Sequence, residues 1–377
     1  MNMSCSVNLD LLNSTTLFFY VYRPYELVLF KFVIPCIILV GIISNTTFIW
    51  TVIRVSSLHT STFMYLFGLA CTDLFTLVGD GMNLANNLLN SPVRFGNIPM
   101  LRGIAAILKW FSFISSISFV TLVSLERYLA ICHPLKYRLI KGTKRTIKLS
   151  LMTIVLSLGI TSTIVVQNFG TPLVVCIVWP ADDQFNVYPH QITTFTAIGD
   201  LSLLYYKITN IAYALFYLFL LTSTCYMYTR ILITLRKRKH NKVLQLSTEL
   251  ERNINQIATM VITNGLVFFL CSTIIIIFMT CATLDLFGVR FLDRYQVDVL
   301  ERVQDIFILV NASVNPLIFL TNRGYRSAVS TAIMKHGFRR HFGNKANNGH
   351  ISMKHIGGNM VNTDMYSKTV DNSVLLQ

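Results

Sequence analysis

The sequence has little charge for its length. Only 13% of its 377 residues are Asp, Glu, Lys or Arg, whereas 53% are hydrophobic. A soluble globular protein carries about twice that charged fraction. The shortage argues against an ordinary soluble domain and indicates several apolar spans of about 20 residues each.

Metal-binding and catalytic patterns are also missing. The eight cysteines are scattered, without a CxxC pair or a Cys/His ligand spacing, which argues against a metal centre. No loop contains a paired catalytic constellation, so we do not expect an enzyme. Residues 1–10 lack a basic region followed by an apolar run, so we expect the first span to act as its own insertion signal.

Acidic residues are fewer than basic ones, 17 against 32, which gives a formal net charge of +15. Such an excess is often seen in nucleic-acid-binding proteins. Here, however, Lys and Arg lie mainly in short stretches beside the ends of hydrophobic runs, as in the cytoplasmic loops of membrane proteins. We therefore expect the lipid bilayer as a partner and no nucleic acid.

Seven hydrophobic segments are long enough to cross a bilayer as helices, because about 20 residues at a rise of about 1.5 Å cover the hydrocarbon core. The sequence predicts an all-α membrane protein, a seven-transmembrane helix bundle. The expected spans are 29–53, 62–89, 101–132, 148–168, 207–235, 256–283 and 299–321.

The distribution of basic residues sets the orientation. With the N-terminus outside, 23 of the 32 Lys and Arg fall on inner surfaces, which agrees with the positive-inside bias. Residues 1–28 are then an extracellular segment, 29–335 the membrane domain and 336–377 a cytoplasmic tail that we expect to be disordered. Asn2 and Asn13 begin glycosylation sequons that an outside N-terminus could use.

Two further helical features are expected on the inner side. The basic stretch at residues 236–242 is predicted to extend the fifth span as a cationic helix. A short amphipathic helix is predicted after the seventh span, opened by Tyr325 and Arg326.

Polar residues inside the spans follow a recognisable order. A charge at the bilayer centre is unfavourable by at least about 2.5–3.5 kcal/mol, so each is a candidate functional residue. They are Asn45 in the first span, Asp73 within the stretch 69–73 of the second, Glu126-Arg127-Tyr128 at the end of the third before Ile131-Cys132-His133-Pro134-Leu135, and the run from Asn311 to Phe319 in the seventh.

Together these motifs resemble the rhodopsin-like (class A) G-protein-coupled receptors, over about residues 29–335. The text from Ile131 to Tyr137 is similar to invertebrate neuropeptide receptors of the FMRFamide type. The family's Asp/Glu-Arg-Tyr motif is represented by Glu126, Arg127 and Tyr128, and its Asn-Pro-x-x-Tyr motif by Asn315, Pro316 and Phe319.

The resemblance implies roles for these positions. Arg127 would be held by Glu126 at rest and released to meet a heterotrimeric G protein. The alternative is that Arg127 is a helix-end arginine that meets lipid head groups.

A sodium pocket is also implied by the resemblance, at Asp73, Ser116, Asn311 and Asn315, with Asn45 in the same polar core. A buried carboxylate needs a cation, hydrogen-bond donors or a proton, so an allosteric sodium ion is chemically reasonable. The alternative is a polar network that joins the helices by hydrogen bonds. No other metal or cofactor is expected.

Some family features are absent. Arg102 stands where the family has a disulfide cysteine at the top of the third span, so Cys176 in the outer loop lacks its usual partner. Cys5 and Cys281 are possible replacements, because the outer face is oxidising. A free Cys176 is the third possibility.

The sixth span also departs from the family pattern, because Cys271-Ser272-Thr273-Ile274 stands in place of Cys-Trp-x-Pro. Without the proline the helix is expected to be straighter. In the seventh span, Phe319 lacks the hydroxyl of the family's tyrosine. These departures raise a second interpretation, a binding (decoy) receptor that does not signal. A solute transporter is a third, but the internal repeat that many transporters show is missing.

The ligand pocket is expected around Lys109, which lies eighteen residues before Arg127 and so about five turns further out. A lysine there would repel amines, and residues 299–321 contain no lysine for a retinal Schiff base, which argues against amine receptors and opsins. Asp80 and Asp305 are candidate counter-ions, and Glu301 lies on the acidic rim. Lys109 could form a closed structural ion pair or receive a carboxylate or carbonyl from a ligand.

The sequence thus predicts a plasma-membrane receptor. It would transmit the binding of an extracellular ligand, expected to be a neuropeptide, to a heterotrimeric G protein.

Overall fold

The computed structural model describes residues 7–11, 17, 20–89, 99–168, 172–186, 188–195, 199–240, 248–320 and 322–332. All of them belong to one compact unit, Met1–Ala332. Asn2, Cys5, Asn13 and the predicted tail at 336–377 lie outside the described residues.

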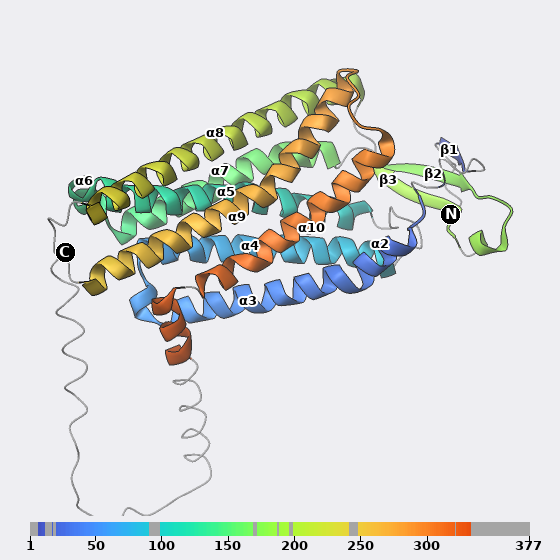
Figure 1. Ribbon diagram of the computed structural model, residues 1–377. Helices are drawn as coiled ribbons and strands as arrows, with labels where there is room; N and C mark the ends of the chain where they lie inside the picture. The colour runs from blue at the N-terminus through green and yellow to red at the C-terminus, as the bar shows by residue number, and fades with distance from the viewer. Residues whose placement is uncertain are drawn as a thin grey trace, which may run out of the picture. The chain divides into compact units, whose positions relative to one another are not determined.

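Long helices run side by side through this unit (Figure 1). Six are long and apolar enough to cross a membrane, and a seventh span is formed if α10 is counted with the helix Arg323–Ala332, which follows at an angle of 87°. The predicted seven-helix bundle is therefore confirmed. Its spans are α3 (Ile34–Arg54), α4 (Ser61–Leu89), α5 (Pro99–Cys132), α7 (Thr143–Asn168), α8 (Gly199–His240), α9 (Thr248–Leu286) and α10 (Arg294–Phe319).

The packing order of the helices places α5 at the centre of the bundle. Helix α5 contacts α4, α7, α8 and α9, whereas α10 contacts α3, α4 and α9. Polar side chains from α3, α4, α5 and α10 can therefore meet inside the unit, which is where the sequence motifs lie.

The first span begins earlier than predicted. Helix α2 (Pro24–Val28) and the π-helical turn η1 (Leu29–Val33) continue directly into α3. The π turn ends two residues before Pro35, which lacks a backbone N–H and crowds the preceding turn. The chain widens there, and the N–H of Ile34 bonds to the carbonyl of Leu29.

Short elements connect the spans at the inner end. These are η2 (Ser56–Leu58) and α6 (Pro134–Ile140), and α6 has a proline in its first turn, as helices often do. Helix α8 continues to His240, so the predicted cationic extension of the fifth span is confirmed as far as that residue, and residues 241–242 lie outside the described part of the chain. At about 1.5 Å per residue, α8 is roughly twice as long as a bilayer core is thick.

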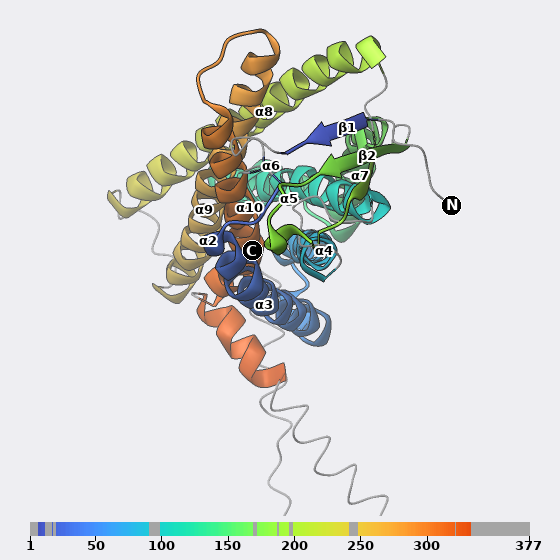
Figure 2. The same ribbon diagram turned by 90° about the vertical axis from the view of Figure 1, so that its right-hand side faces the viewer.

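A small sheet lies at the end of the bundle opposite α6 (Figure 1). It consists of β1 (Val7–Asp10), β2 (Pro172–Val178) and β3 (Gln191–Phe195), in the order β1-β2-β3, and the short helix η3 (Asp183–Phe185) joins β2 to β3. Strand β1 is parallel to β2 and β3 is antiparallel to it. Figure 2 looks onto this end, where β3 contacts α5.

The sequence did not predict this sheet. Ile177 and Ile192 of the sheet belong to a separate hydrophobic cluster, in which the rings of Trp179 and Phe185 stack at 5.7 Å. Burial of these rings fixes the outer loop against the N-terminal segment, because both contribute to the cluster, through Leu11 and Ile192 among others.

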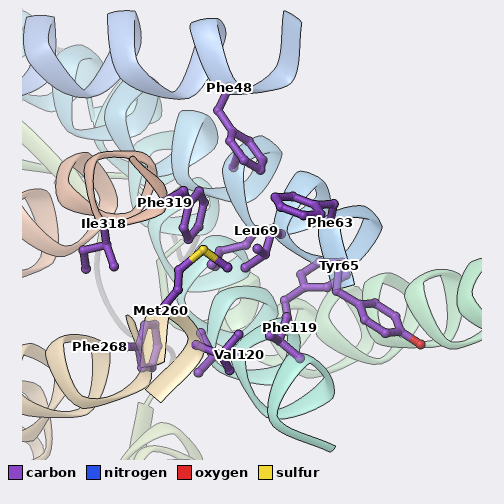
Figure 3. Packing of buried hydrophobic residues seen from close by; sticks show 14 of the residues in the cluster. Phe48, Phe63, Tyr65, Leu69, Phe119, Val120, Met260, Phe268, Ile318 and Phe319 are labelled. Carbon is purple, nitrogen blue, oxygen red and sulfur yellow. The ribbon is translucent and has the colours of Figure 1, made fainter. Parts of the chain in front are cut away.

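The largest hydrophobic cluster lies in the inner half, between α3, α4, α5, α8, α9 and α10 (Figure 3). Phe319 is fully buried, and its ring centroid is 4.8 Å from that of Phe48. Phe48 in turn meets Tyr325 of the last helix at 5.3 Å. The missing hydroxyl of Phe319 is thus consistent with an apolar contact between the first and seventh spans.

The outer end of α10 is fixed by local signals. Asp293 caps the helix by accepting a hydrogen bond from the N–H of Gln296 at 2.7 Å, and the Gln296 side chain returns one to the Asp293 N–H at 3.0 Å. This reciprocal box stabilises the first turn. Gly288, with a φ of 82°, makes the preceding turn after α9, a conformation that favours glycine.

Candidate functional site

Arg127 lies at the inner end of α5 and points toward α4. Its Nη2 donates a hydrogen bond to the hydroxyl of Thr62. The neighbouring Tyr128 faces elsewhere, and its hydroxyl lies 3.0 Å from Nε2 of His133. The guanidinium is therefore held by a neutral acceptor on the second span.

Glu126 does not form the expected ion pair with Arg127 among the described residues. Its Oε2 instead lies 3.2 Å from Nη1 of Arg145 in α7, and its Oε1 accepts a hydrogen bond of 2.8 Å from the hydroxyl of Tyr137 in α6. The physical reason is helical geometry, because consecutive side chains on a helix point about 100° apart. Glu126 and Arg127 therefore face different neighbours.

Tyr137 and Arg145 were not anticipated from the sequence. Burial, and then the hydrogen bond to Glu126, raise the pKa of Tyr137 to about 12, so its hydroxyl stays protonated and remains a donor at physiological pH. The carboxylate of Glu126 is 1% exposed and needs such partners. A basic residue at the start of the fourth span was the only available sequence signal.

Asp73 is the centre of the predicted polar core. It is 1% exposed, and its Oδ2 accepts a hydrogen bond of 2.7 Å from Nδ2 of Asn315. Its Oδ1 accepts one of 3.2 Å from the hydroxyl of Ser116, which also lies 3.0 Å from the hydroxyl of Thr72. The structure thus brings the second, third and seventh spans together at one carboxylate.

The other two predicted core residues occupy different places. Asn45 donates to the carbonyls of Gly41 at 2.8 Å and Ala312 at 2.9 Å, so it joins α3 to α10. Asn311 is buried, but no hydrogen bond joins it to Asp73 in the part of the chain that the structure describes. Three amide oxygens in this region are buried without a donor among the described residues, those of Asn45, Asn311 and Asn315.

This donor set fits a small hard cation. Such ions bind carboxylate, hydroxyl and amide oxygens, and the region supplies Asp73, Ser116 and the orphaned oxygens of Asn311 and Asn315. The hydrogen bonds among the same residues also fit the alternative of a polar network that joins helices. Both interpretations are therefore compatible with the geometry.

Further out, Lys109 of α5 forms an ion pair with Asp305 of α10. The two side chains are 21% and 22% exposed. Asp80 of α4 is 9% exposed and lies within electrostatic range of both. Glu301, one turn above Asp305, is exposed. Of the two predicted counter-ions for Lys109, the structure therefore selects Asp305.

A second outer network was not anticipated. Arg23 and Glu26, at the start of the first span, face Asp298 and Arg302 of α10, with distances of 3.7 Å for Arg23–Asp298 and 3.8 Å for Arg302–Glu26. The guanidinium of Arg23 also lies 4.5 Å from the ring centroid of Tyr295. These contacts hold the N-terminal end of the first span against the seventh.

The sixth span runs without interruption through residues 271–274, where the family pattern has tryptophan and proline. The helix is thus unbroken at this place, and its greater straightness stays a prediction. A tyrosine of the fifth span links this helix to α5, because Tyr228 bonds to the hydroxyl of Ser124 at 2.8 Å and to the carbonyl of Val261 at 3.1 Å. A buried tyrosine hydroxyl requires hydrogen-bond partners, so a tyrosine within an apolar segment was the sequence signal that could have identified Tyr228.

Cys176 is disulfide-bonded, which agrees with the possible disulfide predicted there and excludes the alternative of a free thiol. Cys281 is a free cysteine, which excludes it as the partner. Cys5, the other predicted partner, lies outside the described residues. Strand β1 nevertheless carries the N-terminal segment past this position, because Asn8 is the register partner of Cys176.

Comparison with known proteins gives a family match over most of the bundle. The model described as "7 transmembrane receptor (rhodopsin family)" matches residues 44–319. This range includes Asn45, Asp73, Glu126-Arg127-Tyr128 and the seventh-span motif.

Individual receptors are similar over shorter stretches. The thyrotropin-releasing hormone receptor of Gallus gallus is 27% identical over 179 residues, which cover 47% of this chain and 39% of that receptor. Neuromedin-U receptor 2 of Rattus norvegicus is 34% identical over 114 residues, covering 30% and 28%. The Homo sapiens motilin receptor is 30% identical over 110 residues, covering 29% and 26%. The matched part is thus well under half of each relative.

Proposed function

Because this chain belongs to the rhodopsin family of seven-transmembrane receptors, we propose that it transmits the binding of an extracellular peptide to a heterotrimeric G protein at the plasma membrane. The single observation that carries the proposal is the state of Arg127. Its charged guanidinium sits at the inner end of the central helix, bonded to a neutral hydroxyl rather than locked to a carboxylate.

The inner contacts suggest how the switch operates. Glu126 is already engaged by Arg145 and Tyr137, so release of Arg127 requires only the exchange of the Thr62 contact. A hydrogen bond to a neutral acceptor is weaker than an ion pair at this depth. Separation of the inner ends of α5, α8 and α9 would then open a cleft in which Arg127 meets the partner.

Tyr228 is placed to couple this movement to the sixth span. It bonds to α5 through Ser124 and to α9 through the carbonyl of Val261. Outward displacement of α9 would break the second bond while the first is kept. Although the sixth span lacks the family's proline and tryptophan, Tyr228 therefore still links its inner half to α5.

A peptide ligand is supported by the relatives. They are receptors named for thyrotropin-releasing hormone, neuromedin-U and motilin, and these are peptides. The sheet at the outer end and the ion pairs beneath it offer backbone and charged groups suited to such a ligand. The narrower likeness of residues 131–137 to invertebrate FMRFamide receptors stays a prediction.

A sodium ion would act from the polar core. Asp73 and Ser116, with the amide oxygens of Asn311 and Asn315, would hold it, and its charge would offset that of the buried carboxylate. While it is bound, the second, third and seventh spans would be held in their present arrangement.

The proposal is tested by G-protein dissociation in cells that express the chain, with and without a neuropeptide library. A response lost in Arg127→Ala at unchanged surface expression is the expected result. Thr62→Val should raise the response without ligand, because Arg127 loses its acceptor. Thr47→Val is the matched control, since the hydroxyl of this exposed threonine donates to the carbonyl of Ile43 in its own helix. Peptide binding without any response would instead favour the decoy receptor.

A further inference from the structure

The ion pair of Lys109 changes the charge of the outer pocket. Read alone, Lys109 predicts a site that repels cations. In the structure its ammonium is bonded to Asp305, and an ammonium that is paired in this way no longer presents a net positive charge to a ligand.

Asp80 is a third charged residue near this pair, and it is not part of the pair's hydrogen bond. It is nine-tenths buried, and its Oδ2 has no hydrogen-bond partner among the described residues. Helix α4 approaches α5 closely here, because a Cβ added at Gly79 would lie 3.7 Å from the backbone N of Lys109. Asp80 is also in electrostatic range of Lys109 and Asp305. A buried carboxylate oxygen without a donor is unfavourable unless another group satisfies it.

A second carboxylate lies above it. Glu301 is exposed and four residues before Asp305, so both project from the same face of α10. The neighbouring Arg302 faces Glu26 and Asp298 at 3.8 and 3.9 Å. Lys109 is in electrostatic range of Asp80, Glu301 and Asp305, and Glu301 is also in range of Arg302. Because Lys109 is bonded to Asp305, its charge does not offset that of Asp80 as well.

We propose that Asp80, with Glu301 above it, binds a cationic group of the peptide ligand, and that the pairing of Lys109 with Asp305 prevents Lys109 from repelling that ligand. The proposal rests on the proposed function, since it names the ligand's chemistry at that receptor's outer site. A guanidinium fits best, because its planar donors can engage a carboxylate with two hydrogen bonds.

The test uses two random hexapeptide libraries that differ at one fixed position, arginine in one and its neutral isostere citrulline in the other. The remaining positions exclude Lys, Arg and His. Membranes from cells that express the full chain are incubated with each library, and retained peptides are quantified by mass spectrometry against membranes without the chain. We expect the arginine library to be retained at least about tenfold better.

Three variants make the result specific. Asp80→Asn should bring the ratio of the two libraries close to one. Asp285→Asn is the matched control, because this carboxylate pairs with the exposed Arg290 and its loss should leave the ratio unchanged. Lys109→Gln combined with Asp305→Asn removes the pair but keeps Asp80 and Glu301, so the preference for arginine should persist even if Asp80→Asn fails to reach the surface.

Any other result shows which of the two proposals fails, the cation site at Asp80 or peptide binding by the receptor. Equal retention of both libraries, or an arginine preference that survives in well-expressed Asp80→Asn, overturns the cation site and leaves the peptide receptor standing. Loss of the preference in the Lys109/Asp305 double variant also overturns it. Retention of neither library overturns peptide binding itself.

Discussion

Lys109 and Asp305, in the outer half, are 21% and 22% exposed, whereas Asp73 and Glu126, further in, are each 1% exposed. The outer pair consists of two charges that neutralise each other across two helices. The inner carboxylates are each held by two groups from different helices, Asp73 by neutral donors and Glu126 by a hydroxyl and a cation. The difference separates a region where charges can exchange partners with a ligand from one where they fix the arrangement of the spans.

Of the variants that test this difference between the outer and inner charges, Lys109→Met is expected to have the largest effect on stability. It leaves Asp305 and Asp80 without a cation, and removal of one partner from a buried pair is destabilising by 3–5 kcal/mol in fully buried cases. Because both side chains are partly exposed, we expect a loss of about 3 kcal/mol in the free energy of unfolding, measured by denaturation of the solubilised protein.

The double variant Lys109→Met with Asp305→Leu is the control. It removes both charges, so most of the lost stability should return. A single variant as stable as the parent would show that the pair does not hold α5 to α10.

At the inner end, Arg145→Met tests whether a second donor protects a buried carboxylate. Glu126 would keep the hydroxyl of Tyr137, so the expected loss is smaller, about 2 kcal/mol by the same measurement. Lys144→Met, an exposed neighbour, is the control and should change stability by less than about 0.5 kcal/mol. An Arg145→Met loss larger than that of Lys109→Met would reverse the comparison.

The membrane spans were the part of the fold that could be predicted, because one physical requirement applies to every span. All seven spans could be located, because each needs a long apolar run to satisfy its backbone in lipid. The sheet was missed because β1 and β2 are short and come from segments more than 150 residues apart. No local sequence pattern therefore predicts their pairing. The π turn before Pro35 likewise depends on how the first span is entered.

The site was predictable as a set of residues but not as a set of contacts. Sequence order placed Asp73 with Ser116 and Asn315, and the structure joins them. For Lys109 two counter-ions remained possible until α10 was seen to supply Asp305. The partner of Glu126 was predicted wrongly, because the direction of each side chain around the helix decides which neighbour it meets.

The smallest expected effect is stabilisation by sodium. It separates the two regions further, because this stabilisation should depend on the inner carboxylate of Asp73 and not on the outer one of Asp80. If the ion binds at Asp73, raising sodium to about ten times its dissociation constant should stabilise the folded protein by about 1.4 kcal/mol. Thermal unfolding in sodium chloride, against choline chloride at equal ionic strength, measures this increment. Asp73→Asn should abolish it, because the amide cannot offset the charge of the ion, whereas Asp80→Asn should retain it. An equal increment in Asp73→Asn and the parent would leave Asp73, Ser116 and Asn315 as a network that joins helices by hydrogen bonds alone.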